Sequence, residues 1–193
     1  TDIVVDTGKI RCVIPRSGPQ LFASIERDGK RIAENARLIG YRQDKAEFEP
    51  GEELISEFFQ GETESVVIEQ EGPVRAVVRI DGKHRTNVGR QWLPFTVRLY
   101  FHANGESARI THTLVYDGDD QKDFIKGLGL RFDAPQHDLL HDRHVRFVGE
   151  GSGLWAEAVR GITGLRRNPG EPIKQAQVDG LATPPVAEWD RRV

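Results

Sequence analysis

The stretch from Gln91 to Asp117 constrains the fold more than any other part of the chain, because apolar and polar residues alternate on both sides of a turn signal. Only a β-strand uses a period of two, since its successive side chains point to opposite faces. The pair Asn104-Gly105 separates the two alternating runs and is typical of a tight hairpin. We therefore expect an antiparallel hairpin with these two residues as its loop.

A two-residue loop sets the register of this hairpin, because Ala103 then faces Glu106. The expected cross-strand pairs are Phe101 with Ala108, Leu99 with Ile110, Val97 with His112 and Phe95 with Leu114. Three pairs are apolar, and the fourth places an imidazole on the apolar face. The opposite face is a polar surface able to hold an anion or a sugar. Its residues are Arg98, Tyr100, Arg109 and two threonines. A three-residue loop would exchange the two faces.

Shorter alternating runs, separated by turn signals, extend over much of the chain. The expected strands are 3–6, 10–14, 21–25, 32–33, 38–41, 66–69, 74–80, 128–132, 145–147 and 154–160. The expected turns include Thr7-Gly8, Asp28-Gly29, Gly72-Pro73 and Asp81-Gly82. We interpret residues 83–90 as a polar connection into the hairpin, and no stretch has a helical period. The pattern predicts an all-β, antiparallel, two-sheet β-sandwich of about a dozen strands, supersandwich-like.

Composition excludes several classes of protein. The charges are balanced, with a net charge of −3, so a nucleic-acid binder is not indicated. The lone Cys12 excludes an internal disulfide framework and leaves the redox compartment open. No apolar run reaches membrane-spanning length. The chain has no methionine and starts at Thr1, so we expect a piece of a longer protein. We place a sandwich domain at residues 1–170 and an extension or linker at 171–193.

The candidate catalytic residues lie in and just after the basic connection. They are His84, Arg85, Arg90 and Arg98. A guanidinium fork matches both oxygens of a carboxylate, and an imidazole titrates near neutrality and can move a proton. The alternative is a solvated loop beside an ordinary polar sheet face. Trp92, Tyr100 and Arg109 are candidate substrate-binding residues, with Trp155 and Trp189 as further aromatic groups that either stack on sugars or pack in a core.

Other clusters give weaker signals. His112 is expected to be a neutral core histidine. His137, His141 and His144 have spacings used by zinc sites, but no helix is expected there and no second pair of ligands matches. The aspartates of the loop after Asp117 lack the pattern of a calcium-binding loop. No nucleophile elbow or phosphate loop is present. We expect neither metal nor cofactor.

Five stretches taken in order resemble a known family. They are RSGPQLFASIERDGKRI, EGPVRAVVRIDGKH, LPFTVRLYFHANGESARITHTLVYDGD, IKGLGLRF and RHVRF. The succession is similar to the central β-sandwich domain of the YetA-like / exo-rhamnogalacturonan lyase family. This resemblance covers residues 3–170, and RITHTLVYDGD is its most specific part. It implies two partner domains in the parent chain, a small N-terminal barrel and a C-terminal α/α toroid.

The resemblance further implies metal-independent β-elimination at a uronic acid within an acidic polysaccharide or oligosaccharide. A base removes the C5 proton, cations neutralise the carboxylate, and an acid protonates the departing O4. His84, Arg85, Arg90 and Arg98 are the residue types required, although no one-to-one match to family residues assigns them. We expect the chain to form one wall of the cleft and to be inactive alone. The alternatives are a non-catalytic carbohydrate-binding module and a structural spacer.

Overall fold

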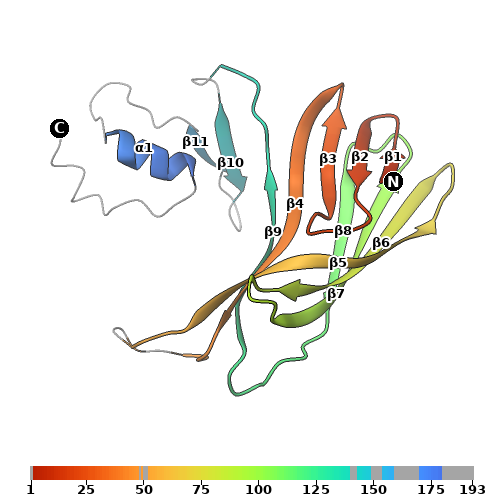
Figure 1. The fold of residues 1–193 in the computed structure, drawn as a ribbon. Coiled ribbons are helices and arrows are strands. Elements are labelled where there is room, and N and C mark those ends of the chain that lie inside the picture. Colours follow the sequence, from red (N-terminus) through yellow and green to blue (C-terminus); the bar gives the residue numbers. More distant parts are fainter. Residues whose placement is uncertain are drawn as a thin grey trace. The chain divides into compact units, whose positions relative to one another are not determined.

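A computed structural model describes residues 2–47, 49, 52–139, 143–148, 154–158 and 170–179. These residues form eleven strands and one helix (Figure 1). The elements are β1 (Ile3–Asp6), β2 (Ile10–Ile14), β3 (Phe22–Arg27), β4 (Lys30–Gln43), β5 (Ser56–Gln70), β6 (Arg75–Arg85), β7 (Gln91–His102), β8 (Ala108–Leu114), β9 (Phe124–Asp133), β10 (His144–Val148), β11 (Leu154–Ala158) and α1 (Glu171–Val178). All the strand pairs between them are antiparallel, so the all-β prediction is confirmed. The short helix was not expected from the sequence.

The chain divides into two compact units, Thr1–Pro135 and Gln136–Val193. The first unit contains β1 to β9, and the second contains the β10–β11 hairpin and α1. In the hairpin, His144 pairs with Ala158 and Val148 with Leu154. The boundary placed at residue 170 from the sequence stays a prediction. Within the described residues, no helix has the length and apolar character needed to cross a membrane.

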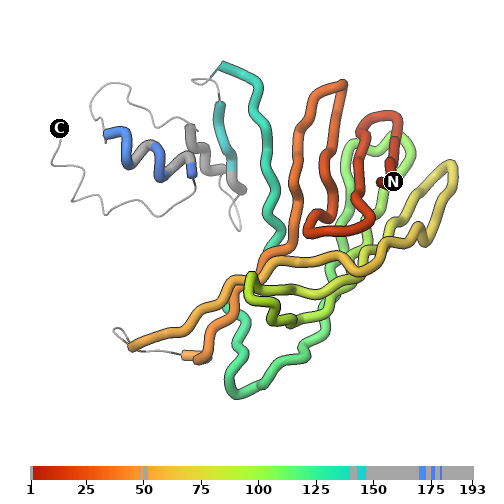
Figure 2. Tube along the Cα trace, in the orientation of Figure 1, coloured from red at the N-terminus to blue at the C-terminus, as the bar shows by residue number. Residues whose placement is uncertain are grey.

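The two layers of the first unit arise because β5 changes its partner strand. Strands β1 to β8 follow one hydrogen-bonded path in chain order, and β9 pairs with β4. Residues 56–60 of β5 pair with β4, whereas residues 60–70 pair with β6 (Figure 2). Register shifts in β5 between Thr63 and Ser65 and between Ile68 and Gln70 are typical of strands that bend at a corner. One layer is therefore β1–β4 with β9, and the other is β5–β8.

The core lies between these layers and consists of alternating inward-facing residues. The first layer contributes Ile3, Ile10, Cys12, Ile14, Leu21, Phe22, Ala33, Ala36 and Leu38, and the second contributes Val78, Ile80, Phe95, Val97, Leu99 and Phe101. Burial of each large apolar side chain contributes roughly 1.5–3 kcal/mol to folding. A smaller cluster of Phe59, Trp92 and Leu93 lies where β5 meets the start of β7.

The register predicted for the central hairpin is confirmed at all four pairs, including Val97 with His112. The predicted two-residue loop is wrong, because the ladder ends at Phe101 and Ala108 and residues 103–107 lie outside it. Thr7 from the β1–β2 turn holds this wider turn. Its Oγ1 donates to the Gly105 carbonyl at 2.7 Å, and its carbonyl accepts from the Asn104 N–H at 2.7 Å.

The turn predicted at Asp81-Gly82 and the loop predicted for residues 83–85 are also wrong, since both lie inside β6. A Cβ built on Gly82 would lie 2.1 Å from the Glu62 carbonyl oxygen and 2.7 Å from the Phe95 ring. Glycine is therefore needed there for close approach between strands. In contrast, Asp28-Gly29 forms the expected two-residue turn, with both residues at positive φ.

Candidate functional site

His84 lies inside the protein and not in a loop. It is on the inward face of β6, 1% exposed, and its Nδ1 lies 2.8 Å from the Leu93 carbonyl oxygen. Its ring packs against Phe95, with 5.2 Å between centroids, and lies 6.1 Å from the half-buried His112 ring. Burial lowers the pKa of both imidazoles. His84 is therefore a neutral core group and offers no exposed nitrogen to a substrate, contrary to the role expected from the sequence.

Arg98 lies on the opposite, outward face of these strands. It pairs across the ladder with Arg79, whereas His84 pairs with Trp92. Those two positions on β7 are roughly 20 Å apart at the usual rise of a strand. Arg98 donates two hydrogen bonds to Glu69, at 2.8 and 3.0 Å. The structure does not bring Arg98 and His84 together.

Carboxylates neutralise Arg98 and Arg79 on the outward face. Glu69 also accepts from Arg79 at 3.1 Å, and Arg79 pairs with Asp81 at 2.9 Å. The hydrogen bond from Arg98 is the main cause of the lowered pKa of Glu69, which keeps this carboxylate charged. We call Glu69, Arg79, Asp81 and Arg98 the paired face. Each arginine there already has a bound carboxylate, so an external anion would compete with an internal one.

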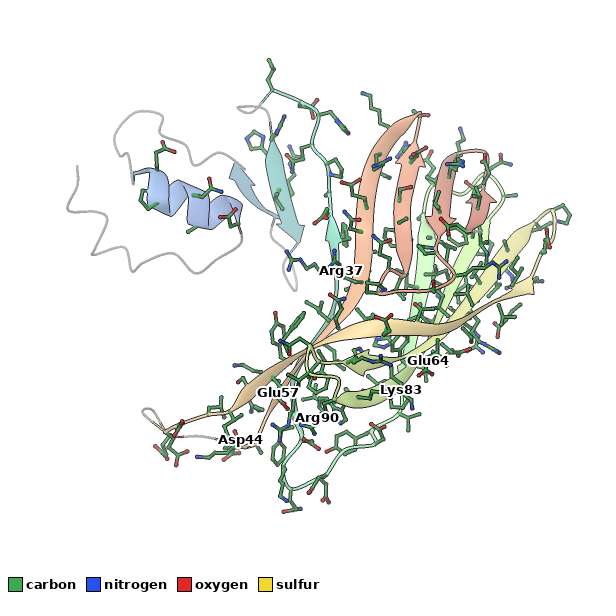
Figure 3. All side chains as sticks on the ribbon, in the orientation of Figure 1. Arg37, Asp44, Glu57, Glu64, Lys83 and Arg90 are labelled. Carbon is green, nitrogen blue, oxygen red and sulfur yellow. The ribbon has the colours of Figure 1, made fainter. Side chains whose placement is uncertain are left out.

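Arg90 belongs to an ion cluster with Arg42, Glu57 and Asp123. Arg90 lies 2.6 Å from Glu57 and 2.5 Å from Asp123, and Figure 3 shows its side chain beside Glu57. Arg42 lies 2.6 Å from Asp123 and 3.2 Å from Glu57. Burial raises the pKa of Asp123, but hydrogen bonds from Arg90, the Asp119 backbone and Arg42 outweigh it and lower that pKa to about 2. Arg90 thus joins β5, β7 and the β8–β9 loop.

The substrate-binding candidates are also separated. Trp92 is 2% exposed and packs against Phe59 and Tyr116, with centroids 5.4 and 6.0 Å away. The prediction of a stacking platform at Trp92 is therefore wrong. Tyr100 and Arg109 lie together on the outward face, where the guanidinium is 5.9 Å from the ring centroid. The Trp155 side chain and all of Trp189 lie outside the described residues, as does His141.

Arg85 is the one of the four candidate catalytic residues that faces an open groove. The groove has a volume of about 510 Å³. It is lined by Ser56, Glu57, Phe58, Gln60, Glu62, Arg85, Thr86, Asn87 and Val88. Arg85 is exposed and lies opposite Gln60 in the β5–β6 ladder. No ion pair engages Arg85 among the described residues, so its guanidinium is available to a bound carboxylate.

Three more cations share this surface, which continues from β6 across β5 and β4 to β9. They are Arg37, Lys83 and Arg131, and with Arg85 we call them the four unpaired cations. None of the four has an ion pair in the described part of the chain. Arg131 pairs across the ladder with Arg37, whose Nη1 donates to the Gln60 side chain at 3.4 Å. Figure 3 shows Lys83 and Arg37 on these strands.

Sequence reasoning missed two exposed aromatic residues on the same surface, Tyr41 and Phe58. Their rings contact across the β4–β5 ladder, with 5.4 Å between centroids. One signal for them was available. Phe58 and Phe59 are adjacent in a strand, so their side chains must point to opposite faces and one ring must leave the core. The structure buries Phe59 completely and leaves Phe58 46% exposed.

Metal ligands do not gather at this surface. Among the described residues, no three side chains of the types His, Cys, Asp and Glu lie close enough to hold an ion. The loop aspartates have structural partners, since Asp117 accepts from the Leu93 N–H and Asp123 accepts from the Asp119 N–H.

The fold and the groove define a class: an antiparallel β-sandwich domain with a polar, partly cationic groove on one outer face. Sequence comparison specifies this class further. Residues 1–193 match the family model of the PcRGLX-like protein central beta sandwich domain. The chain belongs to this family and is the central β-sandwich domain of a rhamnogalacturonan lyase-like protein. The resemblance noted from the sequence is confirmed.

A similar protein is an uncharacterized protein YetA from Bacillus subtilis strain 168. It is 35% identical to this chain over 189 residues, which are 97% of this chain. These residues are 22% of the YetA protein, so the chain spans about a fifth of the length of this relative.

Proposed function

We propose that this domain serves a polysaccharide lyase that cleaves uronic-acid-containing, rhamnogalacturonan-type glycans by β-elimination. The observation that carries the proposal is the family match over the whole chain. In this reaction a base takes the C5 proton, the C5–H electrons form the C4–C5 double bond, and the C4–O4 bond breaks. An acid protonates the departing oxygen. Cations near the uronate carboxylate stabilise the charge that develops there.

The groove supports a role in binding the acidic sugar. Arg85 offers an unengaged guanidinium, and Lys83 adds a second positive charge on the same face of β6. Gln60 and Asn87 line the groove and carry amides suited to sugar hydroxyls. We assign Arg85 to the uronate carboxylate. Arg90 takes a positioning role, because its ion cluster holds β5, which supplies lining residues of the groove, beside the start of β7.

The arrangement of the imidazoles supports inactivity of this chain alone. His84 is buried on the inward face, and His112 is half-buried beside it. Neither imidazole lines the groove. The base and the acid therefore come from other parts of the parent protein in this proposal, and the sandwich forms one wall of the cleft.

The proposal is tested by absorbance of the new C4–C5 double bond during incubation with rhamnogalacturonan oligosaccharides. Two proteins are compared: this chain, and a longer protein that includes the regions flanking it. We expect activity only in the longer protein. There, Arg85→Ala should raise KM and also lower kcat, because the guanidinium binds the carboxylate in the ground state and stabilises the additional charge that develops on it in the transition state. Arg98→Ala is the matched control, since Glu69 already engages Arg98.

Two results would contradict this proposal. A longer, folded protein that yields no double bond from any uronide would show that the domain does not serve a lyase. An active protein in which Arg85→Ala changes nothing, while Arg98→Ala or His84→Gln reduces kcat, would move the site to the residues first expected from the sequence.

A further inference from the structure

An exposed aromatic pair lies on the outer surface where β4 and β5 pair. Tyr41 and Phe58 are direct cross-strand neighbours, 43% and 46% exposed. Their rings lie 5.4 Å apart with an interplanar angle of 55°. The neighbouring residues Arg42 and Phe59 point inward and are buried. The strands therefore bury the Phe59 ring and expose the rings of Tyr41 and Phe58 on the opposite side. Tyr41 and Phe58 therefore offer an apolar patch flanked by polar groups.

Two glycines of β9 extend this patch. Gly127 lies opposite Tyr41, and Gly129 lies opposite Ile39. A Cβ on either glycine would meet its nearest neighbour at 3.9 or 3.8 Å, an ordinary contact distance. Neither glycine has a positive φ. Space and backbone geometry thus permit a side chain at both positions, although glycine weakens a strand. The bare backbone allows a ligand to approach closely beside the rings.

Four cations and the carboxylates of Glu57 and Glu62 lie around this patch. The four unpaired cations Arg37, Lys83, Arg85 and Arg131 lie on the same strands, with Glu62 as the cross-strand partner of Lys83. The chain as a whole has a net charge of −3, so this local excess of positive charge runs against the overall balance. An apolar patch bordered by cations that have no ion pair among the described residues is complementary to a ligand with both apolar faces and carboxylates.

We propose that this surface, which shares Phe58, Gln60 and Arg85 with the groove and so rests on the proposed function, binds an acidic oligosaccharide in this domain alone, without bond cleavage. We call it the aromatic–glycine face; it consists of Ile39, Tyr41, Phe58, Gln60, Gly127 and Gly129. The C–H face of a sugar ring packs on Tyr41 and Phe58, and the glycine backbone gives the neighbouring sugar room. Uronate carboxylates pair with the four unpaired cations. The site gives the domain its own affinity for the polymer chain.

The test is calorimetric titration of this chain with an oligosaccharide of alternating galacturonate and rhamnose, and with a neutral galactan oligosaccharide of equal length. We expect the acidic ligand to bind and the affinity to fall as salt rises, because salt screens exposed charges. Tyr41→Ala and Phe58→Ala should each weaken binding about tenfold, as for truncated aromatic contacts elsewhere. Both side chains are exposed, so the variants should keep the unfolding temperature of the wild type.

Two variants provide the controls. Gly127→Ala adds a Cβ to the bare backbone; it should weaken binding severalfold without loss of stability, since the position has room for a Cβ. Tyr100→Ala removes a ring from the same outer surface but near the other end of the β6–β7 ladder, where Tyr100 pairs with Val77 and lies against Arg109, and it should leave binding unchanged.

The inference is overturned if the wild-type chain binds no acidic oligosaccharide, if it binds the neutral ligand equally well, or if Tyr41→Ala and Phe58→Ala bind like wild type. The first of these results would be expected if another protein segment covers the face. Failure of this binding site can be distinguished from failure of the proposed lyase function, because the first is measured by binding and the second by formation of the double bond. A chain that binds, within a longer protein that cleaves nothing, would refute the lyase and keep this site.

Discussion

Two cationic surfaces of this sandwich differ in whether their charges are already engaged. On the paired face, Arg79 and Arg98 are bound by Glu69 and Asp81 at distances of 2.8 to 3.1 Å. Beside the aromatic–glycine face, the four unpaired cations have no ion pair within the described residues. Residue type is therefore a poor guide to anion binding, because an arginine with a bidentate internal carboxylate has little left to offer an external one.

The two faces also differ in their uncharged residues. The paired face presents threonines and short hydroxyls, and Thr96 and Ser65 donate to Asp81 at 2.8 and 3.2 Å. These hydrogen bonds close a network that is complete without a ligand. The aromatic–glycine face presents rings and bare backbone, which gain contacts only when something covers them. The polar groups of the paired face hydrogen-bond to one another and stabilise the sheet. The rings and backbone of the aromatic–glycine face remain available to a ligand.

The largest effect that we expect concerns a third group of cations, those inside the ion cluster. Asp123→Asn removes the carboxylate that both Arg42 and Arg90 contact, and the Arg42 side chain is only 10% exposed. Arg42 and Arg90 must then share the single carboxylate of Glu57, which should lower the free energy of unfolding by about 3 kcal/mol. Urea denaturation of the wild type and of Asp123→Asn measures this change in the free energy of unfolding. Glu69→Gln on the exposed paired face is the matched control and should leave the denaturation midpoint nearly unchanged; equal effects would show that burial does not separate the two groups.

The second largest effect that we expect is a loss of folding stability in mild acid, caused by protonation of the core imidazoles. Burial lowers the pKa of His84 in the folded state, so the unfolded chain binds more protons below the ordinary value of 6.5. Stability is therefore fully present above pH 6.5 and is lost as the pH falls below it. The ion cluster should respond later, between 3.8 and about 2, because the folded pKa of Asp123 is about 2.

Thermal unfolding at a series of pH values measures this order. His84→Gln keeps a side-chain donor for the Leu93 carbonyl but does not titrate, so its stability should depend less on pH between 5 and 7. A variant with the same pH dependence as wild type would show that His84 is not the titrating group.

The strands and the register of the central hairpin could be predicted from alternation. The continuation of β6 through residues 81–85 could not. Asp28-Gly29 and Asp81-Gly82 are the same dipeptide, and the first is a turn whereas the second lies within β6. The difference is tertiary: Gly82 is required by the approach of Glu62 and Phe95. Because β6 runs on through Arg85, His84 alternates into the core, and no local pattern indicated this.

The residue types of the site could be predicted, but their partners could not. Arg98 pairs with Glu69, 29 positions earlier, and Arg90 with Asp123, 33 positions later. Such separations bring charges together only after the sheets form. The Phe58-Phe59 pair was different, since alternation alone requires one of the two rings to leave the core. A search for apolar residues forced outward would have found the aromatic–glycine face.

The comparison of the two faces is tested most directly by freeing the paired arginines. Glu69→Gln removes the carboxylate that accepts two hydrogen bonds from Arg98 and one from Arg79. If the internal ion pairs prevent the paired face from binding anions, the variant should gain a second, weak site for a galacturonate oligosaccharide at low salt. NMR shift mapping would then show signals of Arg98 and Tyr100 moving in the variant and not in the wild type. The same shifts in both proteins would mean that internal pairing does not block binding.

The smallest expected effect separates binding from stability on the aromatic–glycine face. Gly129→Val introduces a β-branched residue at a strand position where a Cβ has 3.8 Å of clearance from Ile39. Replacing glycine there should raise the free energy of unfolding by about 0.5 kcal/mol, because glycine loses more backbone freedom on folding. Urea denaturation of Gly129→Val and of Gly82→Ala provides the contrast, since the second glycine has no room and its replacement should destabilise the fold. If Gly129→Val is also destabilising, the bare backbone is a packing requirement of β9 and the glycines no longer support a ligand site. If it is stabilising, glycine at this position lowers the stability of the sheet, as expected where a backbone is kept open for a ligand.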